Sequence, residues 1–115
     1  MANENGVSRL ATPAQNPGEK PPRDPHFISR SSDLLEAMAN PSRLHMLTLL
    51  MEEEISVGEL ALRIGLTQSA LSQHLAKLRA NDLVTTRRRG QTVYYTCNSV
   101  AVTQVLAILQ DFFTE

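Results

Sequence analysis

The sequence has little of what covalent and metal-bound frameworks need, because Cys97 is its only cysteine. A single cysteine excludes an intramolecular disulfide and a thiolate-rich zinc or iron–sulfur site built within one chain, and it suits the reducing cytoplasm. The sequence also lacks an apolar run of the roughly 18 to 20 residues that span a bilayer, and its polar N-terminus lacks the apolar segment of a signal peptide. We therefore expect a cytoplasmic protein that has no membrane partner.

Catalytic signatures are missing as well. We find no nucleophile elbow, no glycine-rich phosphate loop and no paired carboxylates in an apolar setting, so no enzyme activity is expected. The chain of 115 residues is 42% hydrophobic and 20% charged, which is an ordinary globular composition. Its length supports one modest core, since a domain of this size buries roughly two-thirds of the surface of its unfolded chain.

Proline is concentrated at the N-terminal end, where residues 1–28 contain five of the six prolines and almost no apolar periodicity. Such a segment cannot bury enough apolar surface to offset the entropy that is lost when it becomes ordered. We predict a disordered tail over residues 1–28 and a folded domain over residues 29–115.

The charges are unevenly distributed, although the net charge is only −1. Residues 63–91 contain six basic side chains and one acidic side chain, a net charge of +5, whereas the rest of the chain carries −6. This asymmetry creates a local positive field that the total charge conceals. It favours an anionic partner for residues 63–91, and the alternative is a basic face that contacts only solvent.

We expect folded structure to begin near Phe27 to Ser32, where a helical stripe starts, and this stripe is interrupted at Asn40. Asn40 has the side chain of an N-cap residue, and proline at the next position suits the first turn of a helix, where its missing N–H is not needed. We therefore predict one helix that ends before Asn40 and a second helix that starts at Pro41 and ends near the acidic run 52–54.

The next segment predicts two helices joined by a tight turn. Ser56 followed by Glu59 is the pattern of a capping box, and Gly65 lies where a helix C-terminus favours a residue without Cβ. A fourth helix over residues 68–80 is capped by Thr67 and has leucines at helical spacing on its inward face. Two helices in this arrangement, the second with a polar and basic outer face, indicate a helix-turn-helix.

The outer face of this fourth helix has the chemistry of a surface that reads DNA. Glutamine and serine side chains can read base edges in the major groove, and lysine and arginine hold phosphates. The predicted base-reading residues are Gln68, Ser69, Ser72 and Gln73. Three-helix proteins also use such a turn for packing alone, which is the alternative interpretation.

A two-stranded hairpin is predicted after the fourth helix. Residues 83–88 and 92–97 are rich in β-branched and aromatic residues, and Gly90 in the loop between them can adopt a positive φ. Three adjacent arginines at the tip repel one another, and a phosphate backbone would relieve that repulsion, although a hairpin tip that is simply soluble is possible. The predicted contacts to the DNA backbone are Thr67, His74, Lys77, Arg79, Arg87, Arg88, Arg89 and Gln91.

A last helix is predicted after Asn98 or Ser99, and its apolar face is wider than so small a core can cover. An uncovered apolar face suggests a partner chain. We therefore predict a homodimer built on the first and last helices. The predicted interface residues are Leu34, Leu35, Met38, Leu106, Leu109, Phe112 and Phe113.

Four segments of the chain stand out together: residues 37–44 (AMANPSRL), 56–61 (SVGELA), 66–79 (LTQSALSQHLAKLR) and 90–95 (GQTVYY). With these segments the chain resembles the ArsR/SmtB family of winged-helix repressors, and the resemblance covers roughly residues 30–115. The resemblance implies a homodimer with the fourth helix in the major groove and the hairpin as the wing. Within the family, the chain is most similar to the NolR-like branch.

The residues that sense metals or sulfur elsewhere in the family are replaced. The two thiol positions of the arsenic and cadmium/lead sensors correspond to Ser56 and Gly58. The zinc-ligand positions of other members correspond to Asn98, Val100, Asp111 and Thr114, and the cysteines of persulfide sensors correspond to Thr48 and Thr114. We therefore expect no metal and no cofactor.

The combined interpretation is a mainly α protein with a β-hairpin wing, a homodimeric winged helix-turn-helix. It is expected to bind double-stranded DNA at a pseudo-palindromic operator and to repress transcription. Two alternatives stay open: a sensor of the same family with an unrecognised metal or small-molecule site, and a winged helix that binds only other proteins.

Overall fold

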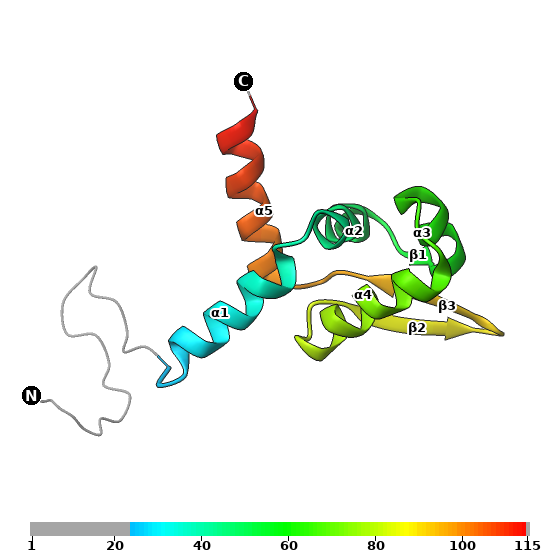
Figure 1. The fold of residues 1–115 in the computed structure, drawn as a ribbon, viewed down its shortest axis with the longest axis horizontal. Coiled ribbons are helices and arrows are strands. Elements are labelled where there is room, and N and C mark those ends of the chain that lie inside the picture. Colours follow the sequence, from blue (N-terminus) through cyan, green and yellow to red (C-terminus); the bar gives the residue numbers. More distant parts are fainter. Residues whose placement is uncertain (1–23, 115) are drawn as a thin grey trace, which may run out of the picture. The chain divides into compact units, whose positions relative to one another are not determined.

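The computed structural model describes residues 24–114. Within these residues the helices are α1 (Phe27–Met38), α2 (Pro41–Glu52), α3 (Val57–Ile64), α4 (Gln68–Ala80) and α5 (Val100–Phe113). The strands are β1 (Ile55–Ser56), β2 (Thr85–Arg89) and β3 (Thr92–Thr96), as Figure 1 shows. None of the helices described is long and apolar enough to cross a membrane.

Residues 24–32 form a turn and the beginning of α1. The N–H of His26 donates to Asp24 Oδ1 at 2.6 Å, and the N–H of Phe27 donates to the Asp24 carbonyl oxygen at 2.9 Å. An aspartate that bonds the backbone two residues on is a common way to close a turn. α1 follows this turn and begins at Phe27, the first residue of the range expected for folded structure and two residues before the end of the predicted tail; residues 1–23 of that tail lie outside the described residues.

The predicted helix starts are confirmed by their capping bonds. Asn40 Oδ1 accepts from the Arg43 N–H at 3.0 Å, and Thr67 Oγ1 accepts from the Ala70 N–H at 3.1 Å. For α5, the sequence left two candidates, and the cap is Ser99, whose Oγ accepts from the N–H of the third helical residue at 3.2 Å. Local side-chain chemistry therefore sets where these helices begin.

The capping box before α3 forms only in part. Ser56 Oγ accepts from the Glu59 N–H at 3.2 Å, as predicted. The carboxylate of Glu59 instead accepts from Arg63 Nε at 3.0 Å, one turn further along α3. At the other end of the helix, Gly65 adopts φ 82°, which confirms the predicted left-handed C-terminus.

The sheet has one strand more than the sequence predicted. It is antiparallel with the order β1-β3-β2, so β1 pairs with β3 and extends the expected two-stranded hairpin. The hairpin loop is also shorter than predicted, because Arg89 is paired with Thr92 and only Gly90 and Gln91 remain in the turn. Gly90 has φ 64°, as expected for glycine at the first position of a two-residue turn.

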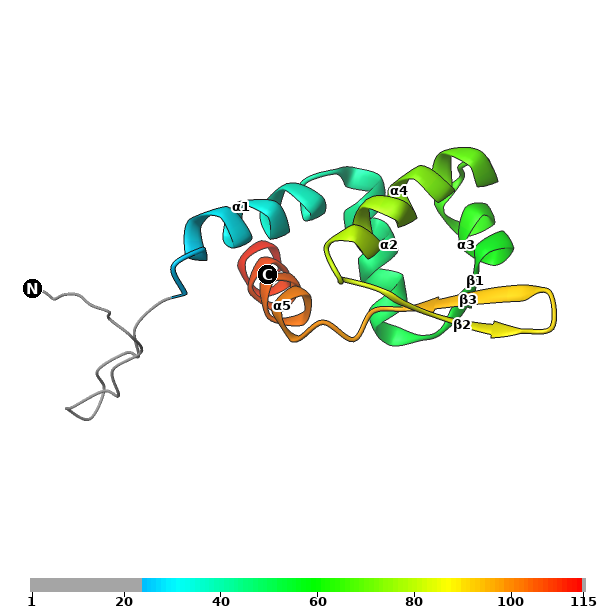
Figure 2. The same cartoon turned by 90° about the horizontal axis from the view of Figure 1, so that it is seen from below.

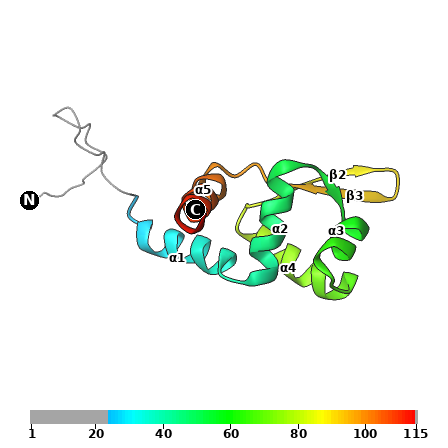
Figure 3. The same ribbon diagram turned by 90° about the horizontal axis from the view of Figure 1, so that it is seen from above.

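One apolar core joins all the helices and the sheet within residues 33–114. Its largest fully buried side chains are Met46, Leu47, Leu50, Leu60, Leu71, Leu78 and Val102. Figures 2 and 3 show α2 between α5 on one side and α3 on the other, with the hairpin projecting past α3. Because α2 lies at the centre, the α3–α4 pair and the hairpin are held on one side of the core.

Candidate nucleic-acid interface

The four side chains predicted to read bases lie on the outer face of α4. Its inward face is set by Leu71, Leu75 and Leu78, which are at most 2% exposed. All four predicted base-reading residues, Gln68, Ser69, Ser72 and Gln73, are exposed, and their side chains make no hydrogen bond within residues 24–114. Their donors and acceptors are therefore available to a ligand.

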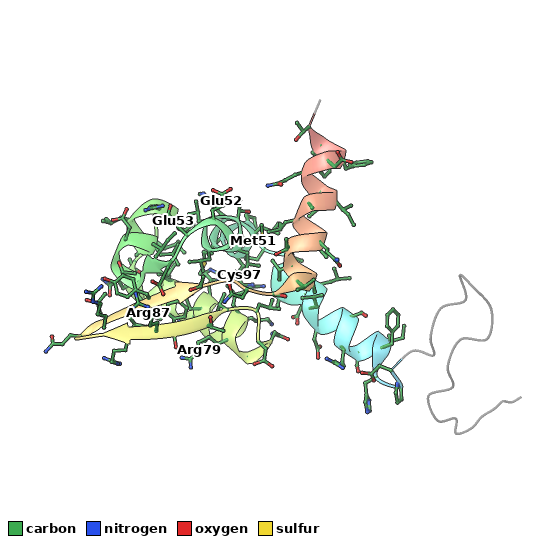
Figure 4. The ribbon with its side chains drawn as sticks, turned by 180° about the vertical axis from the view of Figure 1, so that it is seen from behind. Met51, Glu52, Glu53, Arg79, Arg87 and Cys97 are labelled. Atoms are coloured by element: carbon green, nitrogen blue, oxygen red, sulfur yellow. The ribbon has the colours of Figure 1, made fainter. Side chains whose placement is uncertain are left out.

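The predicted backbone contacts on α4 differ in how free they are. The Thr67 hydroxyl oxygen already caps the helix, and Lys77 Nζ lies 3.2 Å from a carboxylate oxygen of Glu36. His74 Nδ1 lies 3.3 Å from Nη1 of an arginine on α2. The Arg79 side chain is exposed and has no partner in the part of the chain that the structure describes (Figure 4).

The three arginines of the hairpin also differ. Arg87 donates from Nε and Nη2 to the two carboxylate oxygens of Glu54, at 2.9 and 2.7 Å, and its guanidinium lies 5.2 Å from the centre of the Tyr94 ring. Its hydrogen bonds hold the pKa of the Glu54 carboxyl below its ordinary value, and the carboxylate raises the pKa of Arg87. Arg88 and Arg89 are exposed, and neither forms an ion pair or side-chain hydrogen bond within residues 24–114.

Ion pairs reduce the positive charge that the sequence places in residues 63–91. Arg63 bonds the carboxylates of Glu53 and Glu59 at 3.0 Å each, and these bonds raise the pKa of its guanidinium. With Lys77 and Arg87 also paired to glutamates, the cations left without an acidic partner in this segment are Arg79, Arg88 and Arg89. The free positive charge is thus confined to the end of α4 and the hairpin tip.

Sequence reasoning missed the partners that Arg87 and His74 find far away in the chain. Glu54 and Arg87 are 33 residues apart in the sequence, and Arg43 and His74 are 31 residues apart. No periodicity connects residues at such separations. The one available signal was composition. The acidic run 52–54 lies directly before β1, and β1 belongs to the same sheet as the basic hairpin, so opposite charges on the two can pair.

The predicted dimer residues fall into two groups. Met38 is 3% exposed and Leu106 is 5% exposed, so the core of the monomer already covers both. The others keep exposed surface: Leu34 is half-buried, Leu35 is 54% exposed, Leu109 36%, Phe112 77% and Phe113 76%. Ile108, which the prediction omitted, is 68% exposed on the same helix. The C-terminal half of α5 thus carries a continuous exposed apolar surface, and in Figure 1 it extends away from α2.

Two of the positions that correspond to sensor sites elsewhere, Ser56 and Thr48, have local structural roles. The Ser56 hydroxyl caps α3, and the Thr48 hydroxyl donates to the Leu44 carbonyl oxygen at 2.8 Å. Cys97 is buried, and burial raises the pKa of its thiol. Within residues 24–114 no three side chains of histidine, cysteine, aspartate or glutamate are gathered as metal ligands would be. The absence of a metal site in the protein stays a prediction.

The chain is similar to bacterial transcriptional regulators. Residues 40–86 match the family described as bacterial regulatory protein, arsR family. The nodulation protein NolR of Rhizobium meliloti is 50% identical over 93 residues, which are 81% of this chain and 76% of that protein. The transcriptional activator HlyU of Vibrio cholerae is 50% identical over 82 residues, 71% of this chain and 76% of that protein.

Solved structures agree with this similarity. The crystal structure of NolR from Sinorhizobium fredii aligns with a TM-score of 0.75 and 47% identity, covering 80% of this chain and 95% of that chain. The homodimeric winged helix-turn-helix DNA-binding domain of Mb0332 from Mycobacterium bovis aligns with a TM-score of 0.69 and 27% identity, covering 78% of this chain and 86% of that chain. The resemblance inferred from the sequence is confirmed. The chain belongs to the arsR family of bacterial regulatory proteins and is a winged helix-turn-helix regulator of transcription.

Proposed function

We propose that the protein acts in the cytoplasm as a homodimeric repressor that binds a pseudo-palindromic DNA operator. The observation that carries the proposal is the exposed polar face of α4: its glutamine and serine side chains are unpaired within residues 24–114, and the same segment 63–91 holds the free cations Arg79, Arg88 and Arg89. Hydrogen-bonding side chains supply base readout, and free guanidinium groups supply phosphate contacts. Within this proposal Gln68, Ser69, Ser72 and Gln73 read bases, while Arg79, Arg88 and Arg89 bind the backbone.

The other residues predicted to contact the DNA backbone are either uncharged or already paired within the chain. Gln91 is exposed in the hairpin turn, and Thr67 is exposed at the start of α4, where its hydroxyl can still donate. Lys77 can reach a phosphate only by leaving Glu36. Arg87 is held by Glu54 and Tyr94, so we assign it to the support of the wing and not to a phosphate.

The exposed apolar surface of α5 supports the dimer. Ile108, Phe112 and Phe113 are each at least 68% exposed, and a surface of this kind is usually buried by a partner. The relative from Mycobacterium bovis is described as homodimeric, and its fold is the same. A two-fold symmetric dimer would place two α4 helices in successive major grooves, roughly 34 Å apart.

Selection of bound duplexes from a random library tests the proposal. The purified protein should enrich a pseudo-palindromic sequence with half-sites about one helical turn apart. Its affinity for random duplex DNA should fall steeply as salt is raised, because phosphate contacts release counterions. A flat salt dependence and no enriched sequence would favour the alternative of a winged helix that binds only proteins.

Repression is tested separately, because HlyU is named an activator. A reporter gene placed behind the selected operator should be transcribed less when the protein is present. Increased transcription would leave DNA binding intact and overturn the assignment as a repressor.

A further inference from the structure

Arg43 connects the end of α1 with the start of α2. It is the third residue of α2, and its backbone N–H completes the cap on Asn40. Its guanidinium donates from Nε to the Ala37 carbonyl oxygen at 2.5 Å and from Nη2 to the Glu36 carbonyl oxygen at 3.2 Å. Carbonyl oxygens in the last turn of a helix lack intrahelical partners, so an arginine side chain stabilises this end of α1.

The same guanidinium also reaches α4. Its Nη1 lies 3.3 Å from His74 Nδ1, and α4 crosses α2 near the start of α2 (Figures 2 and 3). A guanidinium group carries only donors, so His74 Nδ1 must be the acceptor of this hydrogen bond. The bond therefore exists only when the imidazole is neutral and its proton is on Nε2.

The other ring nitrogen of His74 is free within the described chain. His74 is half-buried between the inward leucines of α4 and the exposed Gln73, and its Nε2 has no partner among residues 24–114. Lys77 lies three residues further on and therefore on the same side of α4. The His74 N–H and the Lys77 ammonium are thus neighbouring donors beside the base-reading face. The N–H is free to bind a phosphate oxygen, whereas Lys77 must first leave Glu36.

We propose that Arg43 is a positioning residue for DNA binding: anchored on the last turn of α1, it holds His74 in the Nε2–H tautomer, and His74 donates that N–H to a phosphate oxygen. The DNA contact rests on the proposed function, whereas the tautomer is a property of the free protein. Without the guanidinium, the imidazole exchanges between its two neutral tautomers and loses its fixed ring orientation. The donor is then no longer held toward one phosphate.

The tautomer is tested in the free protein by ¹⁵N NMR of the imidazole rings at about pH 8, above the ordinary titration range of histidine. We expect His74 to show a protonated Nε2 and an unprotonated Nδ1. In Arg43→Met the two tautomers should mix, whereas Arg63→Met, which removes the same charge from α3, should leave the His74 signals unchanged. A proton on Nδ1 in the unsubstituted protein overturns the proposal.

DNA affinity tests the consequence. Arg43→Met should weaken binding to the operator and to random duplex alike by about tenfold, the effect of losing one well-placed hydrogen bond to a charged group. The double variant Arg43→Met/His74→Leu should bind no more weakly than His74→Leu alone, because both substitutions remove the same contact, that of His74 with the phosphate. Additive losses in this pair overturn the positioning role.

Stability is the competing explanation, and it can be separated. If Arg43→Met does not fold, Arg43→Lys decides the question, because it keeps the charge but lacks the planar fork that bonds three acceptors. A folded Arg43→Lys variant with an unchanged tautomer overturns the proposal. If the unsubstituted protein binds no duplex, the proposed function fails, and the NMR result still stands for the free protein.

Discussion

Arg87 and Glu54 form a two-bond ion pair that joins β2 to the residue before β1. Both bonds are short, at 2.9 and 2.7 Å, and the pair spans the central strand, where the Arg87 guanidinium lies 5.2 Å from the centre of the Tyr94 ring. Parallel bonds from one guanidinium to one carboxylate fix geometry more firmly than a single contact does. The wing is therefore attached to the loop after α2 through the side chain of Arg87 as well as through strand pairing.

The salt dependence of DNA binding should distinguish Arg87 from its neighbours. Arg88→Ala or Arg89→Ala should weaken binding to all duplexes and lower the slope of log affinity against log salt by about one per lost phosphate contact. Arg87→Ala should leave that slope nearly unchanged, because its charge is already paired with Glu54. Salt titrations of the three variants on random duplex DNA test this prediction. If Arg87→Ala also lowers the slope by about one, Arg87 leaves Glu54 and contacts a phosphate when DNA binds.

Base readout by α4 predicts losses that depend on the DNA sequence. Gln68→Ala or Gln73→Ala should cost about 1 to 3 kcal/mol on the operator and almost nothing on random duplex. Gln104→Ala, on an exposed position of α5, is the matched control and should bind both duplexes as the unsubstituted protein does. Equal losses on operator and random duplex would assign these glutamines to the backbone.

Local patterns predicted the helices well, whereas contacts between distant residues could not be predicted. The caps at Asn40 and Thr67 depend on side chains within three residues, so the sequence shows them directly. The strand β1 is only two residues long, too short for alternation to reveal, and it exists because β3 lies beside it. Tertiary pairing of this kind is decided by the fold as a whole.

The residues of the candidate site could be predicted from the sequence, but the charge that remains free on them could not. Sequence analysis counted six basic residues in the segment 63–91, whereas in the structure three of them are paired with glutamates from elsewhere in the chain. The proposed dimer surface shows the same limit. Helical spacing places Leu106 and Phe112 on one apolar face, but only packing determines that Leu106 is 5% exposed and Phe112 77%.

Charge at the exposed end of α5 should abolish the proposed dimer. Phe112→Glu would bury an uncompensated carboxylate at the proposed interface, at a cost of several kcal/mol, and the exposed position makes the monomer tolerant of the change. Leu62→Glu is the control, because Leu62 is equally exposed, at 78%, but lies on α3. Sedimentation should find monomers of Phe112→Glu and dimers of Leu62→Glu; dimers of undiminished affinity in both would place the interface elsewhere.

Two helix ends should respond in opposite ways to substitution. Asp82 follows α4 with φ 58°, a left-handed conformation next to the negative end of the helix dipole, so Asp82→Gly should stabilise the fold by up to about 1 kcal/mol. Gly65 occupies the corresponding place after α3 with φ 82°, and Gly65→Ala should destabilise it by about 1 kcal/mol. No atom lies within 4 Å of a Cβ at Gly65, so backbone strain alone causes the loss. Denaturant titration measures the free energy of unfolding of both variants. A change in the same direction for both would contradict the role assigned to the left-handed conformation.

Release of DNA should require neither a metal nor oxidation of Cys97. Ser56 and Gly58 cannot supply thiolates for a soft metal, Val100 cannot replace an imidazole, and the Thr48 hydroxyl donates to a backbone carbonyl. The reactive form of cysteine is the thiolate, and burial raises the pKa of the Cys97 thiol, so less of it is ionised at neutral pH. A persulfide donor or peroxide should therefore react slowly with this residue.

Operator affinity should accordingly stay within about twofold, less than 0.5 kcal/mol, when zinc, a chelator or a persulfide donor is added. Cys97→Ser places a hydroxyl in a buried position and should lower stability modestly, while the folded variant binds the operator as before. Titrations with both proteins separate the possibilities. A loss of tenfold or more with zinc that persists in Cys97→Ser would require a metal site elsewhere, and His45, His74 and Asp111 are the first residues to replace, since a divalent cation prefers imidazole and carboxylate once thiolates are absent.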